Sequence, residues 1–431
     1  MKIKKRFLLK IASFQVLAMF RRGLFYSFLS IYMRFILGLS VTETTFYATF
    51  PMILNIIFQN FIWGGLSDKY QKRKTLIVAG EILAAIGTVV VWYIHFIQEK
   101  PHMAGYMIII GFSIIEIFWS MSNIGWTAII SDLFKAKDRA SVRGKLASIG
   151  GIGRIIGVTV GGLLYDGFGN FYDGWGFHKG ALFFIASAFM ILSVIPVITL
   201  PEGGVKKEEL ISNKLDDNKK IKKVKSDKIK LFTLFILAMV FINFGRNSIA
   251  TLKAQYLSLE SGLNVSSRIL SYIVNMRSLG IIIFGAIIGI MVKKYKEEFI
   301  LLIGSIMAFL HLVGFALIYI LEATFIFNLL AGISEVIIIA SSYSVASKLI
   351  PPKKRGKLFA IYNATFFLSW GVAGTLIAGP ITDILNHYGF SELMSYKAGF
   401  LSGALLNLIG IIILTVFISK LKHKEQKNIL V

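Results

Sequence analysis

The sequence predicts an all-α membrane protein with twelve transmembrane helices arranged as two similar six-helix halves. Three observations support this fold class. Hydrophobic residues make up 55% of the 431-residue chain and charged residues only 16%, which is too apolar for the polar surface of a soluble domain. Hydrophobic stretches of about 20 residues, the length that crosses a bilayer, recur from Phe7 to Ile418. The two halves also share residues at a constant spacing.

Twelve spans fit these stretches, with boundaries good to a few residues. The start of the chain is basic and then apolar without a small-residue cleavage site, so we expect an uncleaved first helix. A Lys-, Asp- and Glu-rich stretch follows the sixth span and predicts a polar linker. The expected spans are 8–37, 42–67, 75–97, 104–134, 144–165, 181–199, 230–257, 266–292, 299–321, 325–350, 357–384 and 398–418. The expected domains are an N-terminal six-helix bundle in 1–199, a cytoplasmic linker in 200–229 and a C-terminal six-helix bundle in 230–431.

The formal charge of +24 could suggest a nucleic-acid partner, but the positions of the basic residues predict a topology instead. Most of the 47 Lys and Arg residues lie in the two terminal tails, the linker and alternate short loops. The predicted external loops or their edges hold only Lys100, Lys179, Arg268 and Lys397. Since Lys and Arg favour cytoplasmic loops, we expect a multi-pass plasma-membrane protein with both termini in the cytoplasm and no nucleic-acid partner.

The halves repeat at an offset of 224 residues. Arg22 recurs as Arg246 and Tyr32 as Tyr256, and the same offset relates Gly38-Leu39, Gly65, Lys69 and Lys72 to Gly262-Leu263, Gly289, Lys293 and Lys296. Later, Gly162 to Asp166 returns as Gly379 to Asp383. Internal repeats with a binding site between them are a recurring transporter architecture.

The stretch from Gly64 to Lys74 follows the second span and resembles the loop signature of the major facilitator superfamily, G-x-x-x-D-R/K-x-G-x-R/K-R/K, with Gln71 in place of the second glycine. Helix count, halves and linker extend the resemblance over essentially the whole chain. It implies the major facilitator fold, with two pseudo-symmetric six-helix bundles, and secondary active transport by alternating access.

The same stretch predicts an inner gate. A glycine lets a neighbouring helix approach closely, and an aspartate can cap a helix end and pair with a nearby cation. An acidic residue at the end of the fourth span is a further partner. The predicted gate residues are Gly64, Asp68, Lys72, Arg73 and Asp132. The alternative is that the basic residues act only as topology signals.

A glycine pattern in the fifth span, from Gly153 through Gly157 to Gly161-Gly162, is similar to a motif of proton-coupled exporters, G-x-x-x-G-P-x-x-G-G, with Val158 in place of the proline. This pattern favours a multidrug/proton antiporter. The structural alternative is that small residues at this spacing only pack helices together.

Seven ionisable residues lie mid-span, where they are costly and usually face a bundle interior or a water-filled cavity. They are Arg21, Arg22, Glu116, Arg154, Arg246, Arg277 and Glu335. The resemblance places all seven on helices that line the central cavity in the superfamily. Five Arg against two Glu leave positive charge, and Arg offers a planar fork for carboxylate or phosphate.

We therefore expect a small, anionic organic solute as substrate. Arg22 and Arg246 occupy matching places in the halves and are expected to face each other as a clamp. Polar and aromatic residues at the same level complete the predicted substrate site: Trp119, Asn123, Asn247, Asn275 and Asn363. The alternative, a structural salt-bridge network, can neutralise only two of the five Arg.

Proton coupling is assigned to Glu116 and, second, to Glu335, because a carboxyl group in a cavity that alternately closes can change its proton affinity. The structural alternative is a permanent pair of Glu116 with Arg154 or Arg22. The expected partners are thus a small-molecule substrate, the lipid bilayer and a proton or other coupling ion.

An enzyme, a metal site and a cofactor are not expected. The chain has no cysteine, no H-E-x-x-H and no Walker loop, and its six histidines are scattered. Without an ATP-binding loop, a gradient must drive transport. A drug or cation exporter, a sugar carrier and a transport-inactive receptor remain as alternatives.

Overall fold

The computed structural model describes residues 2–134, 136–202, 226–350 and 355–429. These residues form helices joined by short loops, with no β-strand among them. Eleven helices in the described ranges are long and apolar enough to cross a membrane, from Val41–Ser67 to Glu392–His423. The remaining predicted span, 8–37, corresponds to α1 (Lys2–Ile31) and the π-helix η1 (Tyr32–Ile36), which carry Arg21, Arg22 and Arg34. The predicted fold class is confirmed.

Contacts group the described residues into two compact units. Unit 1 comprises those within Met1–Gly38 and Phe50–Lys223, and unit 2 those within Leu39–Thr49 and Val224–Val431. The helix α2 (Val41–Phe58) is therefore divided between the two units.

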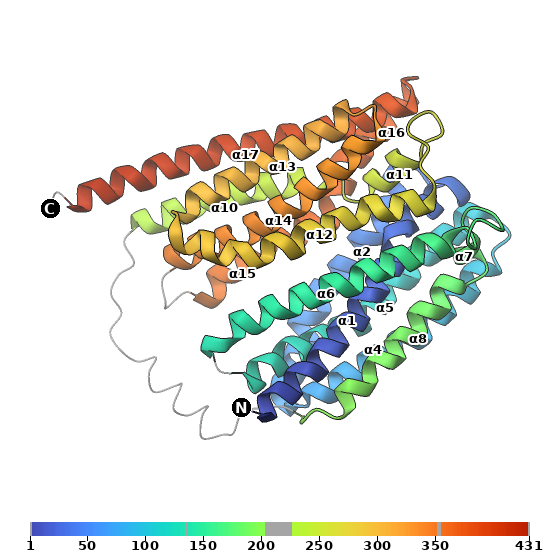
Figure 1. Cartoon of the computed structure of the whole chain (residues 1–431), viewed down its shortest axis with the longest axis horizontal. Helices are drawn as coiled ribbons and strands as arrows, with labels where there is room; N and C mark the ends of the chain where they lie inside the picture. The colour runs from blue at the N-terminus through green and yellow to red at the C-terminus, as the bar shows by residue number, and fades with distance from the viewer. Residues whose placement is uncertain (1, 135, 203–225, 351–354, 430–431) are drawn as a thin grey trace. The chain divides into compact units, whose positions relative to one another are not determined.

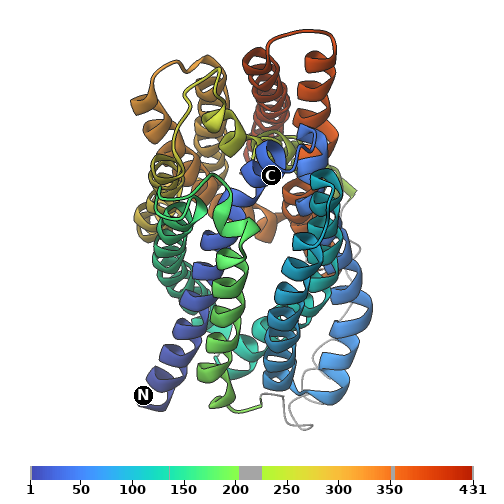
Figure 2. The ribbon, with the colours of Figure 1, turned by 90° about the vertical axis from the view of Figure 1, so that its right-hand side faces the viewer.

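Unit 1 is built around α1. This helix packs on α6 (Ala136–Tyr165) and α8 (Ala181–Ile198), and the three lie side by side in Figures 1 and 2. A second pair, α4 (Arg73–Phe96) and α5 (Pro101–Leu133), packs together, and α4 also contacts α8. The short elements of this unit are η2 (Gln59–Trp63), α3 (Gly64–Tyr70) and α7 (Trp175–His178).

The glycine pattern of the fifth span lies in the α1–α6 contact. A Cβ at Gly157 would lie 2.0 Å from the carbonyl oxygen of Phe20, and one at Gly153 would lie 2.4 Å from that of Val16. Larger side chains cannot fit there, so the glycines allow close helix packing, as the structural alternative expects.

Unit 2 repeats the same pairings. Its central helix α10 (Ser226–Asn247) packs on α15 (Arg355–Ala373) and α17 (Glu392–Ile429), while α13 (Glu297–Leu317) packs on α14 (Leu321–Leu349) and α17. The other elements are α11 (Leu252–Ser258), α12 (Ser267–Lys294), η5 (Gly374–Ala378) and α16 (Gly379–His387). The sequence repeat therefore corresponds to a repeat of helix packing.

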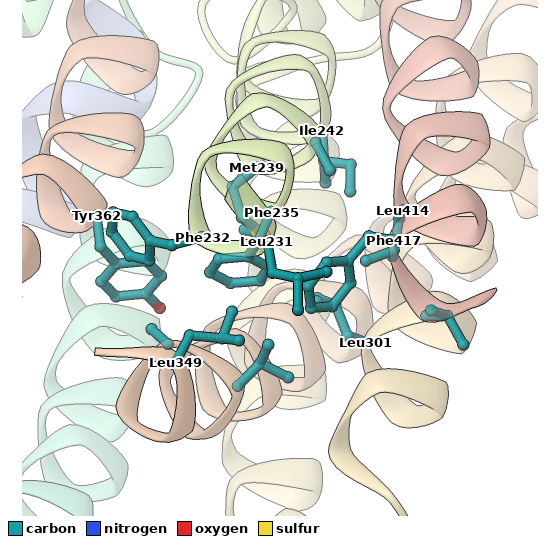
Figure 3. Close-up of a cluster of buried hydrophobic side chains, with 14 of the residues drawn as sticks. Leu231, Phe232, Phe235, Met239, Ile242, Leu301, Leu349, Tyr362, Leu414 and Phe417 are labelled. Carbon is teal, nitrogen blue, oxygen red and sulfur yellow. The ribbon is translucent and has the colours of Figure 1, made fainter. Parts of the chain in front are cut away.

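A buried apolar cluster holds α10 in unit 2. Phe235 lies 5.6 Å, ring centre to ring centre, from Phe417 of α17, and Tyr362 of α15 stacks on its other side (Figure 3). Leu301 of α13 and Leu349 of α14 close the cluster. Because lipid is as apolar as these side chains, van der Waals packing rather than exclusion of water stabilises such helix contacts.

Candidate functional site

The mid-span carboxyl group of unit 1 has a neutral partner. Asn55 of α2 donates a hydrogen bond from Nδ2 to Oε1 of Glu116 on α5, at 2.5 Å. Both side chains are half-buried, and Asn55 is the hydrogen-bond partner that Glu116 has within the described ranges. Arg22 and Arg21 lie near enough to act on this carboxyl group electrostatically. Asn55 was not identified from the sequence, because a single Asn in a span gives no sign of which helix it faces.

A second carboxyl group in unit 1, Glu81 of α4, forms a closed ion pair. Arg21 donates from Nη1 to Oε2 of Glu81 at 2.7 Å, and the exposed fractions of the two side chains are only 5% and 3%. The Ser122 hydroxyl donates to the other oxygen at 2.8 Å, and the Arg21 guanidinium lies 4.4 Å from the ring centre of Trp119. Two predicted substrate residues, Arg21 and Trp119, therefore lie in a buried network.

Glu81 was not identified from the sequence as a partner of Arg21. The position of Glu81 on its helix nevertheless indicates a buried partner. Glu81 shares one face of α4 with the buried residues Ile77, Ala84 and Thr88, and an ionised carboxylate on such a packed face is stabilised by a buried cation.

In unit 2, Arg277 of α12 binds Glu335 of α14 directly. Its Nη2 lies 2.7 Å and its Nε 2.9 Å from Oε2 of Glu335. About one-fifth of each side chain is exposed. The mid-span carboxyl group of this unit is therefore paired with a cation, unlike Glu116.

Two other arginines make no ion pair within the part of the chain that the structure describes. Arg22 of α1 is exposed. Arg246, in the last turn of α10, donates from Nε to Oδ1 of Asn243 at 3.0 Å and lies 5.8 Å from the ring centre of Phe366. These two cations stand at the equivalent places of the sequence repeat.

The remaining predicted substrate residues differ in what they contact. Asn247 is buried and donates to the Ser369 hydroxyl at 2.9 Å, so it joins α10 to α15. Arg154 and Asn123 are half-buried on α6 and α5, Asn275 is half-buried on α12, and Asn363 is exposed on α15.

The predicted gate segment forms a compact turn between α3 and α4. Gln71 takes the left-handed conformation, φ 53°, and its N–H binds the Ser67 carbonyl at 2.9 Å. The loop signature that this stretch resembles has a glycine at this position, and a left-handed backbone favours glycine. The turn is therefore formed here without that glycine.

Arg73 is the buried centre of this turn. It donates to the backbone and hydroxyl of Ser67, and its Nε lies 3.4 Å from Oδ2 of Asp132. Lys72 is exposed, and the atom nearest to a Cβ at Gly64 is the carbonyl oxygen of Gln59 within its own helix. The Asp68 side chain lies outside the described part of the structure.

Glu202 at the start of the predicted linker caps α4, which the sequence prediction did not foresee. Its carbonyl oxygen accepts from the N–H groups of Arg73 and Lys74, and its carboxylate accepts from the backbone N–H of Thr75 at 3.1 Å. A carboxylate at a helix N-terminus is favourable. In the sequence, only a Pro-Glu pair after the sixth span hinted at this cap.

Membrane-length helices with a repeated set of pairings, and charged side chains inside them, define the class of secondary transporters. The Major Facilitator Superfamily model matches residues 11–374 and 235–430. The chain belongs to the major facilitator superfamily and is a transporter rather than an enzyme.

Relatives agree with this assignment. The chain is 24% identical over 373 residues to the multi-drug resistance efflux pump PmrA homolog of Lactococcus lactis subsp. lactis (strain IL1403), which covers 86% of this chain and 83% of that protein. The crystal structure of nucleoside transporter NupG matches with a TM-score of 0.68 at 14% identity, over 96% of this chain and 99% of that one.

A bacterial homologue of the human lysosomal transporter Spinster, in an inward-facing and occupied conformation, matches with a TM-score of 0.69 at 14% identity, over 95% of this chain and 96% of that one. At these identities the structural matches establish the fold.

Proposed function

We propose that this chain is a proton-coupled secondary transporter of a small organic anion. The main support for this proposal is that Arg22 and Arg246 form no ion pair with any described carboxylate. Arg21 and Arg277, in contrast, each form one. A substrate carboxylate or phosphate would supply the missing negative charge. The guanidinium fork suits such groups because it donates two parallel hydrogen bonds.

Glu116 is the proposed proton carrier. Its amide partner has both a donor and an acceptor, so Asn55 can hydrogen-bond the carboxyl group in its ionised and in its protonated form. Glu335 is the weaker candidate, because protonation of Glu335 would leave Arg277 without a counter-charge. Uncompensated charge of this kind is strongly unfavourable.

In this proposal the paired residues support the site. Arg21 and Arg277 fix helices, while Arg154, Asn123, Asn275 and Asn363 remain candidates to contact the substrate. The inner gate is assigned to Gly64, Asp68, Lys72, Arg73 and Asp132, with the Arg73–Asp132 contact as the part that the geometry supports.

A multidrug/proton antiporter is the second candidate function. It is favoured by the relative whose name describes a multi-drug efflux pump, and by the glycine pattern of α6. Both candidates use a proton at Glu116, and they differ in the charge of the solute.

The test is flux in proteoliposomes with an imposed pH gradient, using a panel of labelled mono- and dicarboxylates, organic phosphates and lipophilic cations. The anion proposal expects gradient-dependent movement of an anion that Arg22→Gln and Arg246→Gln each weaken. Movement of cations alone would replace it with the antiporter.

We also propose that both termini and residues 200–229 face the cytoplasm of a plasma membrane, since the basic loops require this orientation. A single cysteine at position 215 should resist an impermeant reagent on intact cells, and one at position 175 should react. Equal labelling at the two positions would contradict this orientation.

A further inference from the structure

The first turns of α2 are held by unit 2, although they precede the rest of α2 in unit 1. The carboxylate of Asp383 on α16 accepts hydrogen bonds from two successive backbone N–H groups at the start of α2. Its Oδ1 lies 2.9 Å from the nitrogen of Val41, and its Oδ2 lies 2.7 Å from that of Thr42. The first N–H groups of a helix have no partner within the helix, and a negative charge there is favourable.

Threonine hydroxyl groups extend this contact down the helix. Thr375 of η5 shares hydrogen bonds with both Thr45 and Thr49, at 2.6 and 2.5 Å, and Thr49 also reaches the Gly371 carbonyl. Thr45 and Thr49 are buried. These contacts are hydrogen bonds between polar groups, and Val41 and Tyr47 of the same segment are buried as well.

A chain of hydrogen bonds between buried side chains also holds the first turns of α2. Tyr396 of α17 donates to Oε1 of Gln255 at 2.7 Å, and Nε2 of Gln255 donates to the Thr44 hydroxyl at 2.8 Å. All three side chains are fully buried. Elements from three parts of unit 2 therefore hold Val41–Thr49.

Both ends of this segment are suited to movement. Gly38, the last residue of unit 1 before it, has φ +71°, and a Cβ there would meet nothing within 4 Å. Pro51 and the π-helix η2 follow the segment within the same long helix. Proline and π-helical turns are common sites of helix bending, and π-helical turns often mark functional sites.

We propose that Asp383 forms a reversible latch: its carboxylate binds the first turns of α2 to the rest of unit 2 and releases them during the transport cycle. Alternating access moves one repeat against the other, and α2 belongs to both units. Either the helix must bend after Thr49 or its first turns must leave Asp383. The sequence repeat had marked Asp383 as the counterpart of Asp166 without giving it a role.

The absence of cysteine from the chain allows a direct test that needs no substrate. In a Thr45→Cys/Thr375→Cys protein, oxidation should form a disulfide, and adding Asp383→Asn should lower the yield about fivefold, because one acceptor and the charge at the helix end are lost. The matched control is Asp166→Asn, whose carboxylate binds the N–H of Gly169 in its own loop and should leave the yield unchanged. An equal yield with and without Asp383→Asn would overturn the latch.

Hydrogen exchange of the peptide that contains Val41 and Thr42 tests reversibility. If the latch opens in the wild-type protein, the disulfide should slow exchange of these amides about tenfold, and reductant should restore it. Exchange that is equally slow before and after oxidation would make Asp383 a permanent helix cap. Thermal unfolding of each variant in detergent separates either result from a failure to fold.

Discussion

Glu116 and Glu335 lie on corresponding helices of the two units, α5 and α14, but they have different partners. Glu116 accepts from the neutral amide of Asn55, whereas Glu335 binds the Arg277 guanidinium. Both are mid-span acids near arginines, so the sequence alone assigns them the same chemistry. We propose from this contrast that Glu116 gains and loses a proton, whereas Glu335 stays in an ion pair with Arg277.

The largest difference is expected in stability. Glu335→Gln leaves the Arg277 cation without its partner and should reduce the free energy of unfolding by about 3 kcal/mol. Glu116→Gln replaces one half-buried hydrogen bond by another and should cost less than about 1 kcal/mol. Chemical unfolding in detergent measures both. Recovery of stability in Arg277→Met/Glu335→Met would confirm the cause, and equal losses for the two Gln variants would remove the contrast.

Asn55→Arg should make unit 1 resemble unit 2. A cation beside Glu116 would form an ion pair that protonation must break, so gradient-driven accumulation in proteoliposomes should fall about tenfold while exchange without a gradient continues. Asn55→Gln keeps an amide at this place and serves as the control. Normal accumulation by the Arg variant would show that the neutral partner is not needed.

Arg22 and Arg246, which form no ion pair with a described carboxylate, should respond alike. Arg22→Lys and Arg246→Lys each keep the charge but lose the planar fork, and we expect each to weaken substrate binding about fivefold. Arg268→Lys, in the first turn of α12, is the matched control. If Arg22→Lys and Arg246→Lys both bind the substrate as tightly as the wild type in equilibrium binding, recognition does not use the fork.

The smallest effect concerns the loops that follow the second helix of each half. Gln71→Gly should stabilise the protein by about 0.5 to 1 kcal/mol, because Gln71 has a left-handed backbone. Tyr295 ends α12 in an extended conformation, φ −121°, so Tyr295→Gly should give no gain. Thermal unfolding of both variants and the wild type tests this, and an equal change in the two variants would contradict it.

The sequence predicted the helices well because apolar length is a local property. The predicted spans 75–97 and 181–199 correspond to α4, Arg73–Phe96, and α8, Ala181–Ile198, and the superfamily assignment is confirmed. Charged residues inside the spans were also visible.

The partners were not visible, because they depend on how each helix is rotated and which neighbour it meets. Glu81 and Arg21 are 60 positions apart, and Asn55 and Glu116 are 61 apart. The contact of Asp383 with Val41 spans 342 positions. Without a second sequence for comparison, no local pattern indicates such pairs.

The central claim is that Glu116, and not Glu335, exchanges the coupling proton. Infrared difference spectra of the purified protein between neutral and acid pH report it directly, since a protonated carboxyl group has a carbonyl stretch that a carboxylate lacks. Solvent exchange into D2O identifies the band by its shift. We expect a carboxyl band that persists in Arg277→Met/Glu335→Met and disappears in Glu116→Gln. A band that survives Glu116→Gln and is lost with Glu335 would contradict the account.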